Sequence, residues 1–441
     1  MSRHLSNAAY GVFDYAAHPI AMLLAAPTLL HHLGVAQYGV WVVATAAVST
    51  GSIIASGFGD ANIQYVAGAR TRDDAVTLLR AVRSMVGINL VLGSAFALIS
   101  WALSPIAARH LAASDISLWT MCLWSLRIAS LLMLVRAIES VCISTQRAFE
   151  RYGAAVRISI TARLLTLVAA VVLTRFGLSV VSVMVATAVL LMLGTAAQLV
   201  RLQQLLGATS LLPAFDREAT SALFGFGTFS WLQAVSGVIF SQADRLILGV
   251  SLGASAVAAY ALCVQMAQPI YGIAASGLHF LFPYLSGRRM TAPLATLKTP
   301  ILKAFAVNLL LVSVGTAGAL LFGKPLLNAW IGAAVARDAG MVLAPIVWSF
   351  ALLGLNVTAY YALLALGHVR TVTLLNLAGG TVMLLGMIWL LPRFGVHGVA
   401  MARLAYGSIA LLTYYPLARL LYRTSPGPSP STGVYPVCED A

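Results

Sequence analysis

Four ionisable residues interrupt long apolar stretches of this 441-residue chain: Asp14, Arg127, Arg163 and Arg403. An ionised side chain within the hydrocarbon of a membrane is costly, so such residues generally face a protein interior or a water-filled cavity. A guanidinium group presents a planar set of donors that binds oxyanions in a bidentate manner. Two interpretations follow: an arginine-lined cavity for an anionic headgroup, or ion pairs between helices that stabilise the bundle.

The depth of each residue in its apolar stretch distinguishes the candidates. Arg127 lies near the middle of its stretch, about 15 Å from either end at about 1.5 Å per residue, too deep for its side chain to reach the surface easily. Asp14 and Arg163 lie at similar depths from the same side, so they could pair with each other. Arg403 lies nearer the opposite side of the membrane. There its side chain could either snorkel partly to the surface or line the cavity.

Asp244 and Arg245 lie at the outer end of another apolar stretch and form a fifth, weaker candidate. At this position, a role as an anchor at the membrane interface competes with a role in binding.

The composition around these residues is that of a membrane protein. Apolar residues make up 60% of the chain and charged residues only 9%, with a mean hydropathy of +0.90. A soluble globular protein has about 45–50% apolar and about 25% charged residues. This excludes an ordinary soluble enzyme and also a disordered chain, which requires low hydrophobicity and high charge.

About twelve apolar stretches are long enough to cross a bilayer as helices, and none alternates as a membrane β-strand does. They cover approximately residues 7–31, 39–59, 84–104, 117–137, 156–174, 179–199, 222–243, 254–281, 303–323, 340–363, 371–391 and 396–421. With the N-terminus inside, 18 of the 27 Lys and Arg residues fall in inside segments and six in outside segments. This bias predicts cytoplasmic N- and C-termini, and it assigns the net charge of +14 to membrane topology rather than to nucleic acid.

An internal repeat relates the two halves of the chain. Arg175–Gly177 precedes the sixth span and Arg393–Gly395 the twelfth, at an offset of 218 residues, and both segments read Arg-Phe-Gly. Leu33–Gly34 and Leu252–Gly253 follow the first and seventh spans at an offset of 219. An even number of spans in each half predicts a parallel repeat about an axis along the membrane normal, with a central cavity between the halves.

We therefore predict an all-α polytopic membrane fold, with two pseudo-symmetric six-helix lobes around a central cavity. The expected divisions are an N-terminal lobe at 1–200, a cytoplasmic linker at 201–221, a C-terminal lobe at 222–422 and a disordered cytoplasmic tail at 423–441.

Five segments carry a resemblance to a known family, in the same order along the chain. They are LLHHLGVAQYGVWVV (29–43), GFGDANIQYVAGA (57–69), FSQADRLILGVSLGASAVAAYA (240–261), LLALGHVRTVTLLNLAGG (363–380) and LPRFGVHGVAMA (391–402). The sequence resembles the Wzx-type polysaccharide flippases, or O-antigen transporters, of the multidrug/oligosaccharidyl-lipid/polysaccharide exporter superfamily.

This resemblance implies a flippase of the bacterial inner membrane and not an enzyme. Its substrate would be an undecaprenyl-diphosphate-linked oligosaccharide, moved from the cytoplasmic to the periplasmic leaflet for O-antigen, capsule or exopolysaccharide synthesis. The lipid bilayer, a polysaccharide polymerase and a chain-length regulator would be its partners, and no cofactor, metal or nucleic acid is expected. The candidates for binding the anionic diphosphate and sugar are Arg127, Arg163 and Arg403, with Asp244 and Arg245 as weaker candidates.

Asp14 has a second interpretation, since a carboxylate within the first span could carry a coupling proton. Other function classes remain open. A cation-coupled drug exporter of the same superfamily is disfavoured by the scarcity of acidic residues inside the spans. A polytopic glycosyltransferase or polymerase would need catalytic residues on sizeable outside loops, and a scaffold of an assembly complex would transport nothing.

Overall fold

The computed structural model describes residues 2–422 except 57, 72–73, 113–114, 150–151, 208–209, 280 and 290–293. Within the helices, several side chains also lie outside this description, including those of residues 2–20, 222–230 and 331–335. The side chain of Asp14 and the predicted tail at 423–441 therefore lie outside the described part of the protein.

Helices account for all the regular structure in the described residues. They are α1 (Ser2–Ser56), α2 (Gly59–Thr71), α3 (Ala75–Ala112), α4 (Ile116–Ala148), α5 (Tyr152–Arg175), α6 (Val180–Leu206), α7 (Arg217–Leu252), α8 (Ala254–Gly277), α9 (Leu281–Arg289), α10 (Leu294–Ala365), α11 (Val369–Ala410), the 3₁₀ turn η1 (Leu411–Thr413) and α12 (Tyr414–Tyr422). The prediction of an all-α polytopic fold is confirmed.

Three of these helices are too long to cross a membrane only once. The 55 residues of α1 would extend for about 80 Å, whereas the hydrocarbon core is about 30 Å thick. Gly34 interrupts α1 at a φ of +75° and Gly395 interrupts α11 at a φ of +55°, values that glycine adopts without steric cost. Both glycines belong to the sequence repeat. At each of them one membrane-crossing segment ends and the next begins.

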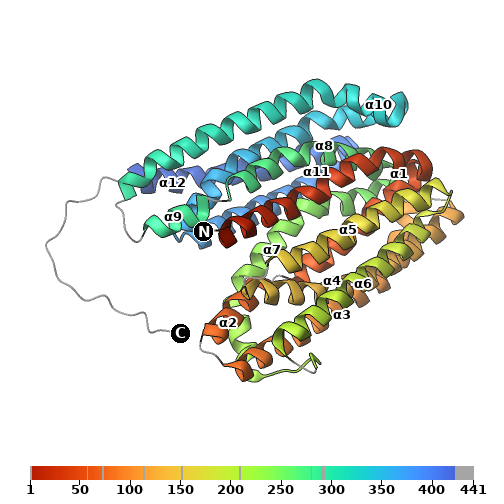
Figure 1. Ribbon diagram of the computed structural model, residues 1–441. Coiled ribbons are helices and arrows are strands. Elements are labelled where there is room, and N and C mark those ends of the chain that lie inside the picture. Colours follow the sequence, from red (N-terminus) through yellow and green to blue (C-terminus); the bar gives the residue numbers. More distant parts are fainter. Residues whose placement is uncertain are drawn as a thin grey trace.

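The third long helix, α10, contains two candidate spans, Thr296–Trp330 and Ala339–Ala365. The Asn308 amide donates to the carbonyl oxygen of Gly354 at 2.8 Å, so the two arms lie side by side. Figure 1 shows them turning at one end of the molecule.

Nine helical segments in the described residues are long and apolar enough to span a membrane. The other predicted spans fall on the arm of α1 before Gly34, on the 36-residue helix α7 and on the arm of α11 after Gly395, all of which are helical.

The passes form two bundles. In the first, α3 packs on α4, α4 on α6, and α5 on α1 and α6; in the second, α10 packs on α8 and α11, and α11 packs on α7. Figure 1 shows the two bundles close together at one end and apart at the end that carries α2 and α9.

The close end is a contact between backbones. A Cβ atom added to Gly39 of α1 would lie 1.8 Å from the carbonyl oxygen of Ala254 in α8. A Cβ atom on Gly249 of α7 would lie 2.8 Å from the Val43 side chain in α1. Glycine at these two positions therefore permits the bundles to meet, because any side chain would separate them.

Asp115 determines where α4 begins. Its carboxylate accepts hydrogen bonds from the backbone N–H groups of Ser117 (2.8 Å) and Leu118 (3.1 Å), in the manner of a helix N-cap. These bonds favour the ionised form and lower the pKa of the Asp115 carboxyl. The fixed start of α4 in turn sets the level at which its inward-facing residues lie.

Candidate functional site

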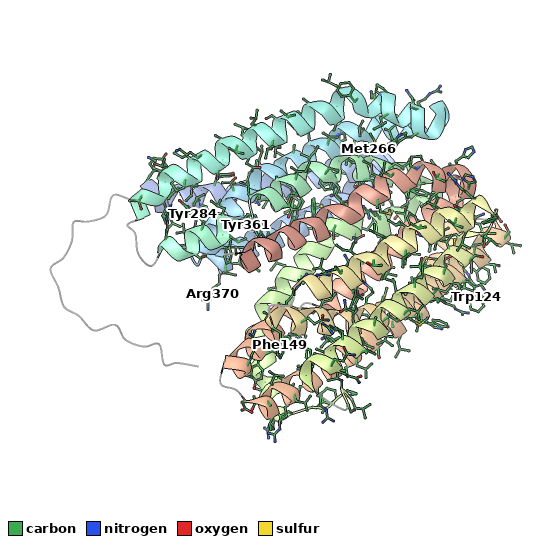
Figure 2. The ribbon with its side chains drawn as sticks, viewed as in Figure 1. Trp124, Phe149, Met266, Tyr284, Tyr361 and Arg370 are labelled. Atoms are coloured by element: carbon green, nitrogen blue, oxygen red, sulfur yellow. The ribbon has the colours of Figure 1, made fainter. Side chains whose placement is uncertain are left out.

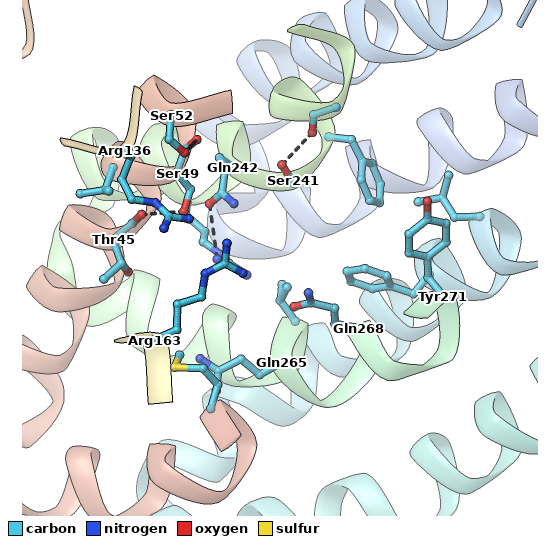
Figure 3. A pocket seen from close by; sticks show the side chains of 18 of the residues that line it. Thr45, Ser49, Ser52, Arg136, Arg163, Ser241, Gln242, Gln265, Gln268 and Tyr271 are labelled. Atoms are coloured by element: carbon cyan, nitrogen blue, oxygen red, sulfur yellow. Dashed lines mark hydrogen bonds between the residues drawn. The ribbon is translucent and has the colours of Figure 1, made fainter. Parts of the chain in front are cut away.

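A cavity of about 630 Å³ lies between the two bundles, with walls from α1, α4, α5, α6, α7, α8, α10 and α11. This volume is in the range of about 300–1,000 Å³ that is typical of sites for small molecules. The walls carry both polar and aromatic side chains, and Figure 3 shows the polar groups that face the space.

Four arginines line the cavity, and its described lining contains no Asp or Glu. They are Arg136 of α4, Arg163 of α5, Arg245 of α7 and Arg403 of α11. Arg163 and Arg403 were predicted for the site and Arg245 was a weaker candidate, so the fold brings three of the sequence candidates to one space.

Arg403 is the most deeply held of the four. Its side chain is only 1% exposed and forms an ion pair with Asp244 of α7, whose side chain is fully buried. Its Nε also donates to the Ser349 hydroxyl at 3.3 Å. The Tyr260 hydroxyl donates, at 2.8 Å, to Asp244 Oδ2, the same oxygen that accepts from Arg403. The pair therefore joins α7, α8, α10 and α11.

Aromatic rings enclose the same guanidinium group. Its central carbon lies 4.2 Å from the ring centroid of Phe240 and 4.6 Å from that of Phe350. Its Nη1 donates to the Phe240 carbonyl oxygen at 3.2 Å. Because Arg403 has a carboxylate, a hydroxyl, a carbonyl oxygen and two aromatic rings as partners, the arrangement is that of a structural ion pair at the cavity wall.

Arg136 is held in a different way. It forms an ion pair with Glu139 three residues later on α4, and Glu139 also accepts a hydrogen bond from the Ser159 hydroxyl of α5 at 3.2 Å. The Arg136 side chain is 19% exposed whereas that of Glu139 is 5% exposed. The arginine therefore faces the cavity and the glutamate lies behind it.

The sequence predicts a span at approximately 117–137, and α4 continues beyond it as a helix to Ala148, with Arg136 at the cavity wall. Arg136 and Glu139 could have been recognised from their spacing of three residues, which places an acid and a base on one helix face.

Asp244 and Arg245 are neighbours in sequence but point in different directions. Asp244 is turned into the protein core toward Arg403, whereas Arg245 lines the cavity. Arg245 Nη1 lies 3.5 Å from the Gln242 amide oxygen, and its Nε has no hydrogen-bond partner in the described part of the chain. No carboxylate among the described residues pairs with Arg245, so its charge is directed at the cavity.

Arg163 of α5 also lines the cavity. Figure 3 shows Arg163 and Arg136 on the same side of the cavity, near Thr45 and Ser49 of α1. The Thr45 and Ser49 hydroxyls donate to backbone carbonyl oxygens of α1, so the guanidinium groups are the donors on this side that suit an oxyanion. The predicted pairing of Arg163 with Asp14 stays a prediction, since the Asp14 side chain lies outside the described residues.

Arg127 is not among the residues that line the cavity. Its guanidinium carbon lies 5.0 Å from the Trp101 ring centroid and 5.4 Å from that of Trp124. Trp124 is 49% exposed, and Figure 2 shows it on the outer side of the first bundle, away from the second. The structure thus accommodates this mid-span charge by cation–π contacts with two tryptophans.

Comparison with known proteins gives a family and a fold. Residues 28–333 match the model of a family described as polysaccharide biosynthesis protein. No curated protein matches the sequence.

Solved structures of transporters share the architecture over nearly the whole chain. The chain is similar to a multidrug resistance transporter of the MATE family and MOP superfamily in its inward-facing conformation, with a TM-score of 0.75, 14% identity, and coverage of 94% of this chain and 100% of that one. It is also similar to the lipid II flippase MurJ in an inward closed conformation, with a TM-score of 0.73, 12% identity, and coverage of 91% and 87%. A third match is the MATE multidrug transporter DinF-BH, solved as a complex, with a TM-score of 0.65, 16% identity and 95% coverage of both chains. The fold is therefore that of a multi-pass membrane transporter.

Proposed function

The chain belongs to the polysaccharide biosynthesis protein family, and on that premise we propose that it is a flippase for undecaprenyl-diphosphate-linked oligosaccharide. It moves this substrate from the cytoplasmic to the periplasmic leaflet of the bacterial inner membrane, for the synthesis of O-antigen, capsule or exopolysaccharide. One observation carries the proposal: a central cavity lined by four arginines, with no carboxylate among its described lining residues.

The charges of the cavity match the part of the substrate that cannot cross a bilayer unaided. A diphosphate presents several oxygens to guanidinium groups, and Arg163 and Arg245 face the cavity in positions to bind them. The polyprenyl tail is apolar and stays in the lipid, because a volume of about 630 Å³ suits a headgroup rather than a long chain.

The direction of movement has a favourable electrical component. One charge that crosses 100 mV contributes about 2.3 kcal/mol. A diphosphate with two negative charges that leaves the negative interior therefore gains roughly twice that amount. Ion coupling through Asp14 or another group could add to this driving force without being required by it.

The geometry supports alternating access. The two bundles touch through Gly39 and Ala254 at one end and diverge at the other (Figure 1). With both termini in the cytoplasm, as the positive-inside rule predicts, the diverging end faces the cytoplasmic leaflet. The substrate headgroup enters from that leaflet, and separation of the bundles at the Gly39 contact releases it on the other side.

A cation-coupled multidrug exporter is the second candidate. The structural similarity to MATE multidrug transporters favours this function as much as the similarity to MurJ favours a flippase. The charge of the cavity decides between them in our proposal. Arg136 and Arg403 are each paired with a carboxylate, but Arg163 and Arg245 add positive charge, and the described lining offers no carboxylate to bind a cationic drug.

The test is a leaflet assay in the native host with the chromosomal copy of the gene deleted. The readout is accumulation of lipid-linked glycan on the cytoplasmic side of the membrane. We expect relief by the wild-type protein and by Arg127→Gln, whose arginine lies outside the cavity, but not by Arg163→Gln at equal membrane levels. Relief by Arg163→Gln equal to the wild type would remove the anion-binding cavity from the proposal. Export of a cationic dye by the wild type without relief would instead support the drug exporter.

A further inference from the structure

A second pocket, of about 450 Å³, lies at the turn of α10 and shares no lining residue with the central cavity. Figure 1 shows this turn at the end of the molecule opposite α9. With both termini in the cytoplasm, as the positive-inside rule predicts, the pocket lies at the periplasmic surface of the membrane. Its walls include Lys324 and Asn328 from the first arm of α10, and Arg337, Gly340 and Met341 from the other side of the turn.

Two basic side chains meet in this pocket against the charge bias of the whole chain. Only six of the 27 Lys and Arg residues fall in segments predicted to be outside, and Lys324 and Arg337 are two of these six. In the part of the chain that the structure describes, neither makes a hydrogen bond or an ion pair, and no carboxylate is among the described lining residues. Because like charges repel each other, a pocket with this lining gains stability when an anion binds.

The packing of the two arms directs the lysine toward the arginine. A Cβ atom added to Gly340 would lie 3.6 Å from Lys324 Cε, so the lysine stem packs on the bare backbone of the opposite arm. A Cβ atom on Gly323 would lie only 2.7 Å from the Leu343 side chain, so the arms are in close contact at this level. Arg337 precedes Gly340 by one helical turn and therefore lies on the same face of that arm.

The surface next to the pocket is apolar and faces lipid. The predicted spans end at residue 323 and begin again at 340, so the basic groups lie at the level of the headgroups. One turn further into the membrane, Leu321 is 70% exposed, and on the second arm Met341 is 64% exposed. A soluble anion has no use for such a surface. A phospholipid matches both parts, because its phosphate suits the basic groups and its acyl chains suit the apolar ones.

We propose that the pocket formed by Lys324, Asn328 and Arg337 binds the headgroup phosphate of an anionic phospholipid from the outer leaflet. The two basic side chains bind phosphate oxygens, Arg337 in a bidentate manner, and the Asn328 amide donates a further hydrogen bond. The acyl chains lie along Leu321 and Met341. A lipid with net negative charge is preferred to a zwitterionic lipid, whose ammonium group would meet two cations. The inference is independent of the transported substrate.

The experiment identifies the lipid that contacts this pocket. In the full-length protein, Met341 is replaced by the photo-crosslinking residue p-benzoylphenylalanine, and the protein is placed in nanodiscs with equal amounts of phosphatidylglycerol and phosphatidylcholine. After illumination, mass spectrometry measures the ratio of the two lipid adducts. A basic side chain near a membrane surface contributes about a fivefold preference for an anionic lipid. We therefore expect the phosphatidylglycerol adduct to exceed the phosphatidylcholine adduct by about tenfold or more.

Matched variants assign this preference to the two basic side chains. The double variant Lys324→Gln/Arg337→Gln should bring the adduct ratio close to one. Arg393→Gln removes a charge from another predicted outside segment, where the arginine lies against Trp389, and should keep the wild-type ratio. The same photo-crosslinking residue at Leu193 of α6, which is exposed and lines neither pocket, should report the bulk lipid composition.

Several results would overturn the inference. An adduct ratio near one at Met341 in the otherwise wild-type protein shows that the pocket does not select an anionic lipid. If an excess then appears in Asp338→Asn, this neighbouring carboxylate, whose side chain lies outside the described residues, neutralises the pocket. An excess that survives in the double variant arises from other groups. Loss of the excess in inorganic phosphate, but not in chloride at equal ionic strength, assigns the pocket to a soluble anion.

Misfolding does not imitate the expected result. Lys324 and Arg337 are both exposed and have no partner among the described residues, so the double variant should keep the unfolding temperature of the wild type. That temperature is measured in the same nanodiscs. A ratio near one at an unchanged unfolding temperature therefore reports the loss of the lipid site itself.

Discussion

Two arginines at the wall of the same cavity each have a carboxylate partner, yet they differ in what else surrounds them. Arg403 is 1% exposed and contacts Asp244, Ser349, a carbonyl oxygen and two aromatic rings. Arg136 is 19% exposed and is held by Glu139 alone among the contacts that the structure describes for it.

The difference separates a structural charge from one that can change partners. A fully enclosed ion pair joins helices, and loss of either member leaves a buried charge uncompensated. A partly exposed arginine with one carboxylate behind it can exchange that carboxylate for the anion of a substrate. An arginine at a cavity wall is therefore assigned a role by its complete set of partners rather than by its position.

The largest expected effect is on stability, in the buried pair. Replacement of Asp244 by Asn leaves Arg403 charged and unpaired, and should lower the free energy of unfolding by about 3–5 kcal/mol. The double variant Asp244→Leu/Arg403→Met should recover most of this loss, because it removes both charges. Thermal unfolding in detergent measures the effect. The comparison fails if Asp244→Asn is no less stable than Glu139→Gln.

The second effect concerns binding rather than stability. Arg163→Gln removes charge-assisted hydrogen bonds of about 1.5–3 kcal/mol, so farnesyl diphosphate should bind about ten to a hundred times more weakly. Its unfolding temperature should fall less than that of Arg403→Gln, because the Arg403 pair is fully buried. Arg403→Gln serves as the contrast, and we expect it to lose stability first. Equal losses of stability in the two variants would erase the distinction between the arginines.

The third prediction is a gain in affinity rather than a loss, and it tests the Arg136 pair directly. Glu139→Gln removes the carboxylate that competes for Arg136, so we expect farnesyl diphosphate to bind about three- to tenfold more tightly. Glu139→Asp, which keeps the charge, is the matched control and should change affinity less. Titration at low and moderate salt concentrations measures both. Weaker binding by Glu139→Gln would mean that Glu139 positions Arg136 rather than competing with the substrate.

The smallest expected effect is at Arg127, outside both ion pairs. Arg127→Met removes cation–π contacts with Trp101 and Trp124 that contribute about 0.5–1 kcal/mol each at exposed sites. Transport in the leaflet assay should stay within about twofold of the wild type. Complete loss of transport at normal membrane levels would show that location outside the cavity does not exclude a role in function.

Much of the fold could be predicted because hydropathy is a local property. Stretches of about 20 apolar residues must form helices in a bilayer, since each backbone polar group has to be bonded within its own segment. The repeat at an offset of 218–219 residues placed Gly34 and Gly395 at pass boundaries, and the structure has both at interruptions of helices. The sequence did not single out Arg136 as a cavity residue, because a position near the end of a predicted span gives no sign of its ion pair with Glu139.

The site was only partly predictable, for a reason that Arg127 and Arg403 illustrate. Depth within a span suggested that Arg127 faces a cavity and that Arg403 could snorkel. The structure places Arg127 against tryptophans on the outer side and Arg403 in the core. Depth depends on position along the chain, whereas the direction of a side chain depends on how each helix is rotated against its neighbours.

The sequence by itself determined the class of molecule, its helical passes and its division into related halves, because these follow from apolar length and repeated turns. Only the tertiary structure decided which charges share a cavity and which are neutralised. Asp244 and Arg245 show why: adjacent residues on a helix point about 100° apart, so packing sends one to the core and the other to the cavity. The partner that completes the Asp244 pair lies 159 residues away, and no local pattern in the chain connects the two.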